Sequence, residues 1–258
     1  MNKNLNELNS DELKYHIDSY LNTFKSYAKN KNLRSNDIEF LESLDTIKKN
    51  LNIKNQNHIE RQLSKILLYL IEPYDENLQT KASTYFKVAL ELAKKQDIFK
   101  PIIEKDDDIR NIICSNNIIR NKPINDAGDM EAALQLNTRE TESMQYVLKN
   151  VLSLEKNSSN IDLEDILSVY KKIKKGGKYV TDVTAIRDSS SHSKYRIEQN
   201  KIIFKNNKKG YDYYQEFTFK EFQDFMGRKG QLYALFFILY QLLYLGNLVR
   251  IYFIKNKQ

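Results

Sequence analysis

The stretch QLYALFFILYQLLYLGNLV, from Gln231 to Val249, contains no charged residue. Its length matches a membrane span, which needs about 20 apolar residues. Its tyrosines, however, are spread along the stretch instead of gathering at its ends, where a membrane span would favour them. The polar and amphipathic residues inside it are Tyr233, Tyr240, Gln241, Tyr244 and Asn247. We therefore expect a helix buried in a bundle core or a dimer interface, with a membrane anchor over 232–249 as the alternative.

The rest of the chain contains few helix breakers. With 7 Gly and 3 Pro in 258 residues, its long uninterrupted runs predict a mainly helical protein. Asn9 with Glu12, and Asn36 with Glu39, have the spacing of a capping box at the start of a helix. Apolar periodicity predicts helices over 9–28, 36–51, 58–71, 77–96, 129–154 and 162–175, and a short helix from Tyr179 into Arg187. The predicted fold class is all-α in the main, an antiparallel helical bundle.

The sequence changes in character after His192, where a small β-hairpin is predicted over about residues 195–219. Strand-type residues surround the polar turn Gln199-Asn200, and a second polar turn at 206–210 precedes a further strand. Helix is expected again from Lys220. The chain is thus expected to consist of an N-terminal helical region, 1–96, with a packing or regulatory role, and a helical domain with the hairpin, 97–258.

Composition favours acidic partners. The net charge is +7 and the pI is about 9.1, which suits RNA, DNA or an anionic membrane surface. The single cysteine, Cys114, excludes an intramolecular disulfide and a cysteine-based zinc site. Residues 1–13 lack the apolar core of a signal peptide, so we expect a cytoplasmic protein. The acidic run 106–108 is interpreted as the start of a helix, not as a metal site, because consecutive helical residues point in different directions.

The stretch AIRDSSSH, from Ala185 to His192, contains the chemistry-bearing residues of the chain. Arginine supplies a permanent, planar cation with several donors. Histidine is the side chain whose ordinary pKa lets it exchange a proton near neutral pH. Together they suit phosphodiester cleavage, which needs a proton shuttle and a group that stabilises developing negative charge.

Arg187, Asp188 and His192 fit a known pattern, in which Arg is followed by Asn, His or Asp, then by three variable residues and His. In this the chain resembles the HEPN superfamily, the small helical domains of prokaryotic toxins, abortive-infection proteins and CRISPR-associated ribonucleases. The resemblance is best from about Asp129 to the C-terminus. The chain departs from the family in two places. Ser193 stands where many members have Gly, and Tyr195 lies three residues after the His, where some toxin members have a Tyr two residues after it.

The resemblance implies a toxin-like or antiviral endoribonuclease that needs no metal or other cofactor. In that mechanism the ribose 2′-hydroxyl attacks the neighbouring phosphate and leaves a 2′,3′-cyclic phosphate. His192 would act as general base or acid, Arg187 would bind the phosphate, and Asp188 would orient either of them or hold the local turn. Family members usually form dimers with one shared cleft. One copy lacks a second proton-transfer group, so we expect a symmetric homodimer, with an antitoxin or a regulatory protein as a further partner.

Residues near the motif are candidates for contacts with an RNA backbone or its bases. They are Lys178, Lys194, Tyr195 and Arg196. The alternative function is a non-catalytic HEPN-like binding or assembly module, and a third is a membrane-anchored helical protein. A purely structural role for the motif also stays open, with Arg187 and Asp188 paired to neighbours and His192 capping its helix. A Ser-His hydrolase is disfavoured, because no Gly-flanked nucleophile turn surrounds the serines.

Overall fold

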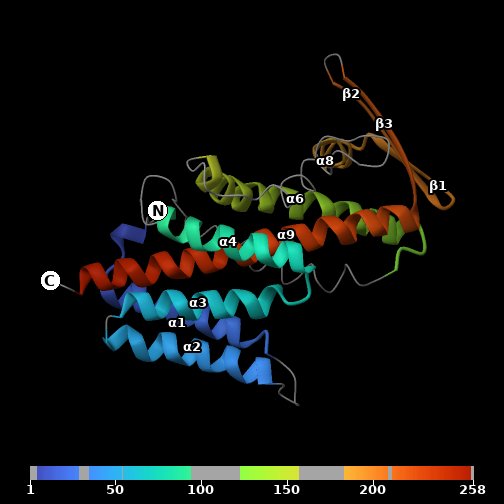
Figure 1. Cartoon of the computed structure of the whole chain (residues 1–258). Coiled ribbons are helices and arrows are strands. Elements are labelled where there is room, and N and C mark those ends of the chain that lie inside the picture. The colour runs from blue at the N-terminus through green and yellow to red at the C-terminus, as the bar shows by residue number, and fades with distance from the viewer. Residues whose placement is uncertain are drawn as a thin grey trace. The chain divides into compact units, whose positions relative to one another are not determined.

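The structure, a computed structural model, describes residues 5–28, 35–53, 55–93, 123–156, 183–208 and 211–256. Over these residues the chain is mainly helical, with a small three-stranded antiparallel sheet (Figure 1). This confirms the predicted mainly α class and the predicted strand region. The chain forms two compact units, and two long helices, α6 (Ala127–Lys156) and α9 (Phe219–Lys255), contribute residues to both.

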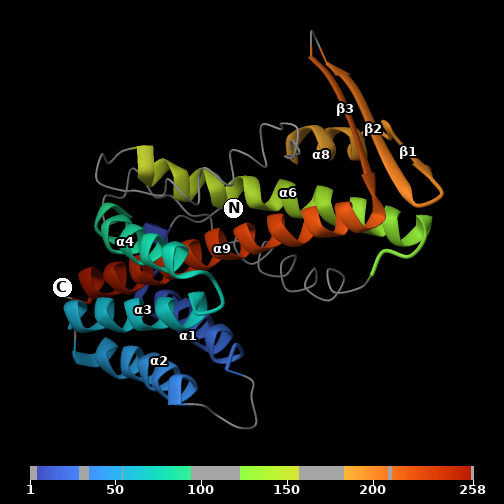
Figure 2. The ribbon, with the colours of Figure 1, turned by 45° about the vertical axis from the view of Figure 1, so that its right-hand side comes forward.

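The first unit contains four helices, the end of α6 from position 149 and the part of α9 from position 235. The four helices are α1 (Ser10–Lys25), α2 (Ser35–Ile53), α3 (Gln56–Ile71) and α4 (Glu76–Ala93), and the 3-10 turn Leu5–Glu7 precedes them. In this unit α2 packs on α1 and α3, and α3 packs on α4. Figure 2 shows the same neighbours side by side from a second direction.

Local sequence determines where α1 begins. Asn9 is its N-cap: the Asn9 side chain accepts a hydrogen bond from the Glu12 backbone at 2.9 Å, and the Glu12 carboxylate accepts one from the Asn9 backbone at 2.8 Å. The predicted capping box is therefore confirmed. The helix predicted over 36–51 is confirmed as α2, but the predicted cap was wrong, since α2 begins at Ser35 and Asn36 lies inside it. The Asn36 amide instead donates to Glu72 after α3, at 3.4 Å, so an interhelical contact replaces the local cap.

In the first unit the apolar part of α9 packs closely against the N-terminal helices. The rings of Tyr20 and Tyr244 stack with their centroids 5.0 Å apart. A Cβ added at Gly246 would lie 2.6 Å from the Leu90 side chain and 3.3 Å from that of Leu63. Gly246 therefore permits a closer approach of α9 to α3 and α4 than a larger residue would, in keeping with a buried core helix.

Among the described residues, α9 is the helix long and apolar enough to cross a membrane, with a mean hydropathy of 1.7 over its most apolar window. However, 83% of that window is buried inside the protein. Core helices of globular proteins pass the same test of length and composition. The predicted buried helix is therefore confirmed, while a cytoplasmic location stays a prediction.

The second unit contains α6 up to position 148, the short helix α8 (Val183–Ser191), the sheet, and α9 up to position 234. Its strands are β1 (Tyr195–Glu198), β2 (Lys201–Lys208) and β3 (Tyr211–Thr218), and they pair in the order β1-β2-β3. β2 and β3 extend into the predicted polar turn at 206–210, since Asn206 and Asn207 pair with Tyr213 and Asp212. Backbone pairing therefore continues through residues whose polarity suggested a turn.

One face of the sheet is buried and the other is exposed. Ile202, Phe204 and Phe217 lie on the buried face, where Phe204 and Phe217 contact Phe222 of α9 with ring centroids about 6 Å apart. α8 contacts β2, and Figures 1 and 2 both show it beside the sheet. This aromatic cluster fixes the sheet and α8 next to the start of α9, which positions the end of α8 and the residues that follow it.

The predicted boundary between residues 96 and 97 lies in the segment 94–122, outside the described residues, and so stays a prediction. Among the described residues, the N-terminal helices share a compact unit with the end of α9, while the Arg-x4-His motif lies in the other unit.

Candidate functional site

The three predicted catalytic residues lie on α8 and directly after it. Ala185, Ile186 and Ser189 are buried, so one side of this helix is fixed against the protein interior. The Arg187 side chain is 20% exposed and that of Asp188 is 11% exposed, whereas His192 is exposed. The buried side of α8 therefore anchors a short helix, on which Asp188 is largely buried, Arg187 is partly exposed and His192 follows at the surface.

Arg187 and Asp188 form an ion pair. The Arg187 Nη2 lies 2.5 Å from Asp188 Oδ1, and the Arg187 Nε donates to the same oxygen at 3.1 Å. Asp188 therefore restrains the orientation of the guanidinium, while its part in any reaction stays a prediction. The remaining donors of the guanidinium fork are not used by this contact.

A Schellman motif fixes His192 at the end of α8. The backbone N–H of Lys194 donates to Ser189 at 2.8 Å, and that of Ser193 donates to Ser190 at 3.4 Å. This is the 6→1 and 5→2 pattern of the motif. Ser193 has the left-handed φ of 52° that the motif requires, and His192 occupies the C-cap. Among the described residues, the His192 ring has no hydrogen-bond or ion-pair partner. The imidazole is thus exposed on a fixed backbone.

The predicted RNA-binding residues have different surroundings. Lys194 is exposed. Tyr195 is half-buried and contacts Phe204, with ring centroids 6.5 Å apart. Arg196 is 72% exposed but forms an ion pair with Glu198 at 2.6 Å. Lys178 lies outside the described residues.

The serines of the motif show no activated nucleophile. Ser189 is buried, and the Ser190 hydroxyl donates to the Ile186 backbone carbonyl of its own helix at 2.8 Å. A hydroxyl bonded to the i−4 carbonyl is an ordinary feature of helices. This arrangement gives no support to a Ser-His hydrolase.

Sequence analysis missed a buried polar cluster in the second unit. Lys229 of α9 is 1% exposed, and its Nζ lies 2.5 Å from Asn137 Oδ1 and 3.1 Å from Glu140 Oε2 of α6. Asn137 and Glu140 are fully buried, as is nearly all of Thr141. The Lys229 ammonium also lies 5.3 Å from the centre of the Tyr233 ring. The three α6 residues lie at i, i+3 and i+4 on one helix face, but their partner is far away in the sequence and no local motif marks it.

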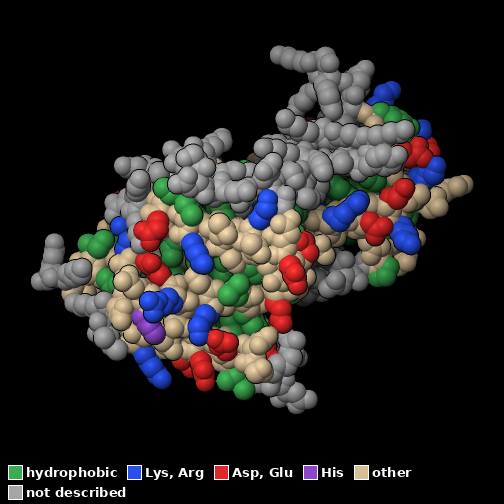
Figure 3. All heavy atoms as spheres, in the orientation of Figure 1, with side chains coloured by type: hydrophobic (Ala, Val, Ile, Leu, Met, Phe, Trp, Pro, Cys, Tyr) green, Lys and Arg blue, Asp and Glu red, His purple; other side chains and the backbone are tan. Residues whose placement is uncertain are grey.

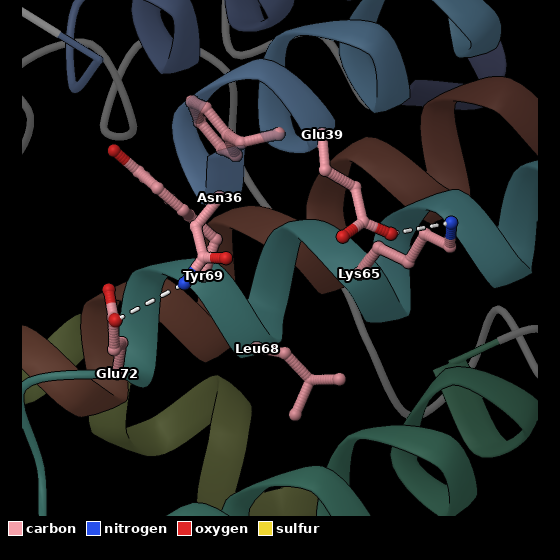
Figure 4. A pocket seen from close by; sticks show the side chains of 7 residues that line it. Asn36, Glu39, Lys65, Leu68, Tyr69 and Glu72 are labelled. Carbon is pink, nitrogen blue, oxygen red and sulfur yellow. Dashed lines mark hydrogen bonds and ion pairs between the residues drawn. The ribbon is translucent and has the colours of Figure 1, made fainter. Parts of the chain in front are cut away.

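A groove in the first unit lies between α2 and α3 and has a volume of about 200 Å³. Figure 4 shows its two polar links, Asn36 to Glu72 and Lys65 to Glu39, the latter at 2.8 Å. The half-exposed Leu68 lies in the same groove. Because these charged groups pair with one another across two helices, they cross-link the bundle, and they form no constellation for proton or phosphoryl transfer.

The charge pattern differs from a single cationic surface. Figure 3 shows Lys and Arg side chains interspersed with Asp and Glu over α2, α3 and α4. Within the described ranges, no group of three or more His, Cys, Asp or Glu is placed to hold a metal ion, and the acidic run 106–108 lies outside those ranges. Arg187 and His192 of the sequence motif both belong to the second unit.

Comparisons with known proteins find no match to this chain among family models, curated proteins or solved structures.

Proposed function

We propose that the chain is a metal-independent endoribonuclease of HEPN type, toxin-like or antiviral, that acts as a homodimer. The observation that supports this most is the exposed imidazole of His192, held by a helix cap five residues after a guanidinium that a carboxylate orients. A proton-transfer group and a fixed cation on one short helix are the minimum that phosphodiester cleavage requires of each subunit.

In the proposed reaction, His192 of one subunit takes the proton of the ribose 2′-hydroxyl. The 2′-oxygen attacks the adjacent phosphorus, and the bond to the 5′-oxygen of the next nucleotide breaks. His192 of the partner subunit gives a proton to that 5′-oxygen. Arg187 holds the phosphate and stabilises the extra negative charge of the transition state. The products are a 2′,3′-cyclic phosphate and a 5′-hydroxyl.

The test is cleavage of a fluorescent single-stranded RNA in the presence of EDTA, with the oligomeric state followed by light scattering. We expect cleavage that a 2′-O-methyl group at the scissile nucleotide abolishes. His192→Ala is expected to reduce the rate by at least about 100-fold without loss of folding, and Arg187→Ala to reduce it strongly. The control is His58→Ala, on α3 in the other unit. Cleavage that survives both motif changes, or that requires a divalent ion, excludes the proposal.

One observation favours a non-catalytic binding or assembly module as a second candidate. Two nitrogens of the Arg187 guanidinium already contact Asp188, so part of its capacity for a phosphate is occupied. In that case the unaltered chain cleaves no RNA under any condition. Asp188→Asn would then change the affinity for a binding partner, and there would be no rate of RNA cleavage for it to change.

A further inference from the structure

The exposed face of the sheet carries a row of side chains directly after the motif. In the register of the sheet, Lys205 lies opposite Tyr214, and the Lys205 backbone N–H donates to the Lys194 carbonyl at 3.1 Å. Residues opposite one another in an antiparallel pair share a face. The alternation that buries Phe204 therefore turns Lys205 and Tyr214 outward, and Lys194, one position before Tyr195, extends this row.

Tyr214 is unusual on this surface because it is 61% exposed. The aromatic residues of the opposite face, Phe204 and Phe217, are buried and hold the sheet in place. Tyr214 is therefore an open ring on a fixed strand. An exposed ring of this kind is a platform on which an unpaired base can stack.

The cations on this face fall into two classes. Arg196 and Lys201 form ion pairs with Glu198 and Glu216, at 2.6 and 2.5 Å. Lys205 is exposed and has no ion-pair partner among the described residues. Its charge is thus not neutralised by the protein, which leaves it to an external anion.

The row is also close to the motif along the chain. Lys194 follows His192 by two residues, so their Cα atoms are at most roughly 7 Å apart. An RNA strand that binds at His192 would therefore lie close to Lys194, the first residue of the row.

We propose that Lys194, Lys205 and Tyr214 form the surface that holds single-stranded RNA beside His192, with a base stacked on Tyr214 and a phosphate at Lys205. This inference rests on the proposed ribonuclease function. It names unpaired RNA as the substrate, because a stacking platform needs a base that is free of its partner strand.

The experiment measures binding of a fluorescent 12-nucleotide unstructured RNA by the full chain with His192→Ala, at several salt concentrations. The KM for cleavage is measured in parallel in the chain with His192 intact. Tyr214→Ala is expected to weaken binding about 5- to 150-fold, while Tyr214→Phe keeps it within about twofold, since the ring remains. Affinity for RNA falls as salt rises, and Lys205→Gln is expected to make the slope of log affinity against log salt less steep by about 0.7. The controls are Lys14→Gln and Tyr15→Ala on α1, where Tyr15 is 72% exposed, and neither should change binding.

The outcomes separate this inference from the proposed function. If the unaltered chain cleaves RNA, but Tyr214→Ala and Lys205→Gln change neither affinity nor KM, the binding surface is wrong and the nuclease proposal stands. If the chain neither binds nor cleaves single-stranded RNA, both are wrong. Circular dichroism of the Tyr214 variants, with Tyr214→Phe as reference, shows whether a loss of binding reflects a loss of fold.

Discussion

The second unit contains two ion pairs with opposite surroundings. Arg187 and Asp188 are neighbours in the sequence, and their side chains remain 20% and 11% exposed. Lys229 and Glu140 come from different helices, and their side chains are 1% and 0% exposed. A buried pair must overcome the cost of removing two charges from water, so it survives only in a fixed geometry. A partly exposed pair can exchange a partner for a solute, which is what a phosphate-binding guanidinium must do.

The neighbours of the two pairs reinforce this difference. On α6 the polar residues Asn137 and Glu140 lie between the buried Met130 and Met144, so the pair with Lys229 interrupts an apolar helix face. Only one alignment of α6 with α9 brings these groups together. The buried pair is suited to specify the packing, and the partly exposed pair is suited to act on a ligand.

Lys229→Ala is expected to have the largest effect on stability of the changes that test this comparison. The change leaves the Glu140 carboxylate buried without its cation, so we expect a loss of about 3–5 kcal/mol in the free energy of unfolding. Urea denaturation followed by circular dichroism measures it. A loss below about 1 kcal/mol would show that the cluster is open to water in solution.

A double variant separates desolvation from packing at the same place. With Lys229→Met and Glu140→Leu together, no charge is left buried, and we expect most of the lost stability to return. If the double variant is as unstable as Lys229→Ala, the stability that the cluster contributes depends on the fit of its side chains and not on their charges.

Arg187→Ala is expected to cost much less, about 1 kcal/mol, since the pair is partly solvated and Asp188 keeps a further interaction. The cost should fall as salt rises, because exposed charges are screened, whereas the cost at Lys229 should change little. Denaturation at low and high salt distinguishes the two. If Arg187→Ala lowers the free energy of unfolding as much as Lys229→Ala does, and independently of salt, then Arg187 and Asp188 behave as a buried pair too.

The same contrast explains what the sequence could predict. The Asn9 cap, the strand region and the helices within the described residues depend on residues within a few positions of one another, and their patterns indicated them. The predicted cap at Asn36 and the predicted turn at 206–210 were wrong, and the helix predicted over 162–175 lies outside the described residues. The Lys229 cluster depends on which helices become neighbours, and a single Lys in a helical stretch looks like any surface residue. The ion pair of Arg187 with Asp188 joins neighbours in the sequence, but the exposure of Tyr214 required the register of the sheet. The alternation of a strand shows which residues share a face and not which face is buried.

Ser193→Gly tests the fixed backbone after the exposed pair. A left-handed φ costs a non-Gly residue roughly 1–2 kcal/mol, and Gly removes this cost while adding freedom to the unfolded chain. We therefore expect a gain of about 0.5–1 kcal/mol in stability, measured by thermal denaturation. Ser190→Gly, inside α8, is the matched control and should destabilise. A loss of stability with Ser193→Gly would contradict the Schellman geometry at His192.

The smallest effect is expected at an exposed carboxylate bonded to backbone, where α9 begins. Hydrogen bonds from the Thr218 backbone, at 2.7 Å, and from its hydroxyl hold the pKa of Glu221 below its usual range. A lowered folded-state pKa contributes stability above the unfolded-state value, and this contribution is lost as pH falls through about 4.3 and then through the folded-state pKa. We expect Glu221→Gln to reduce stability by about 0.5 kcal/mol at pH 7 and by less at pH 3, as measured in urea. Equal losses of stability at both pH values would show that the ionised Glu221 carboxylate has no part in the cap. The helix start would then depend on the Thr218 hydroxyl, which accepts a hydrogen bond from the Glu221 backbone at 3.2 Å.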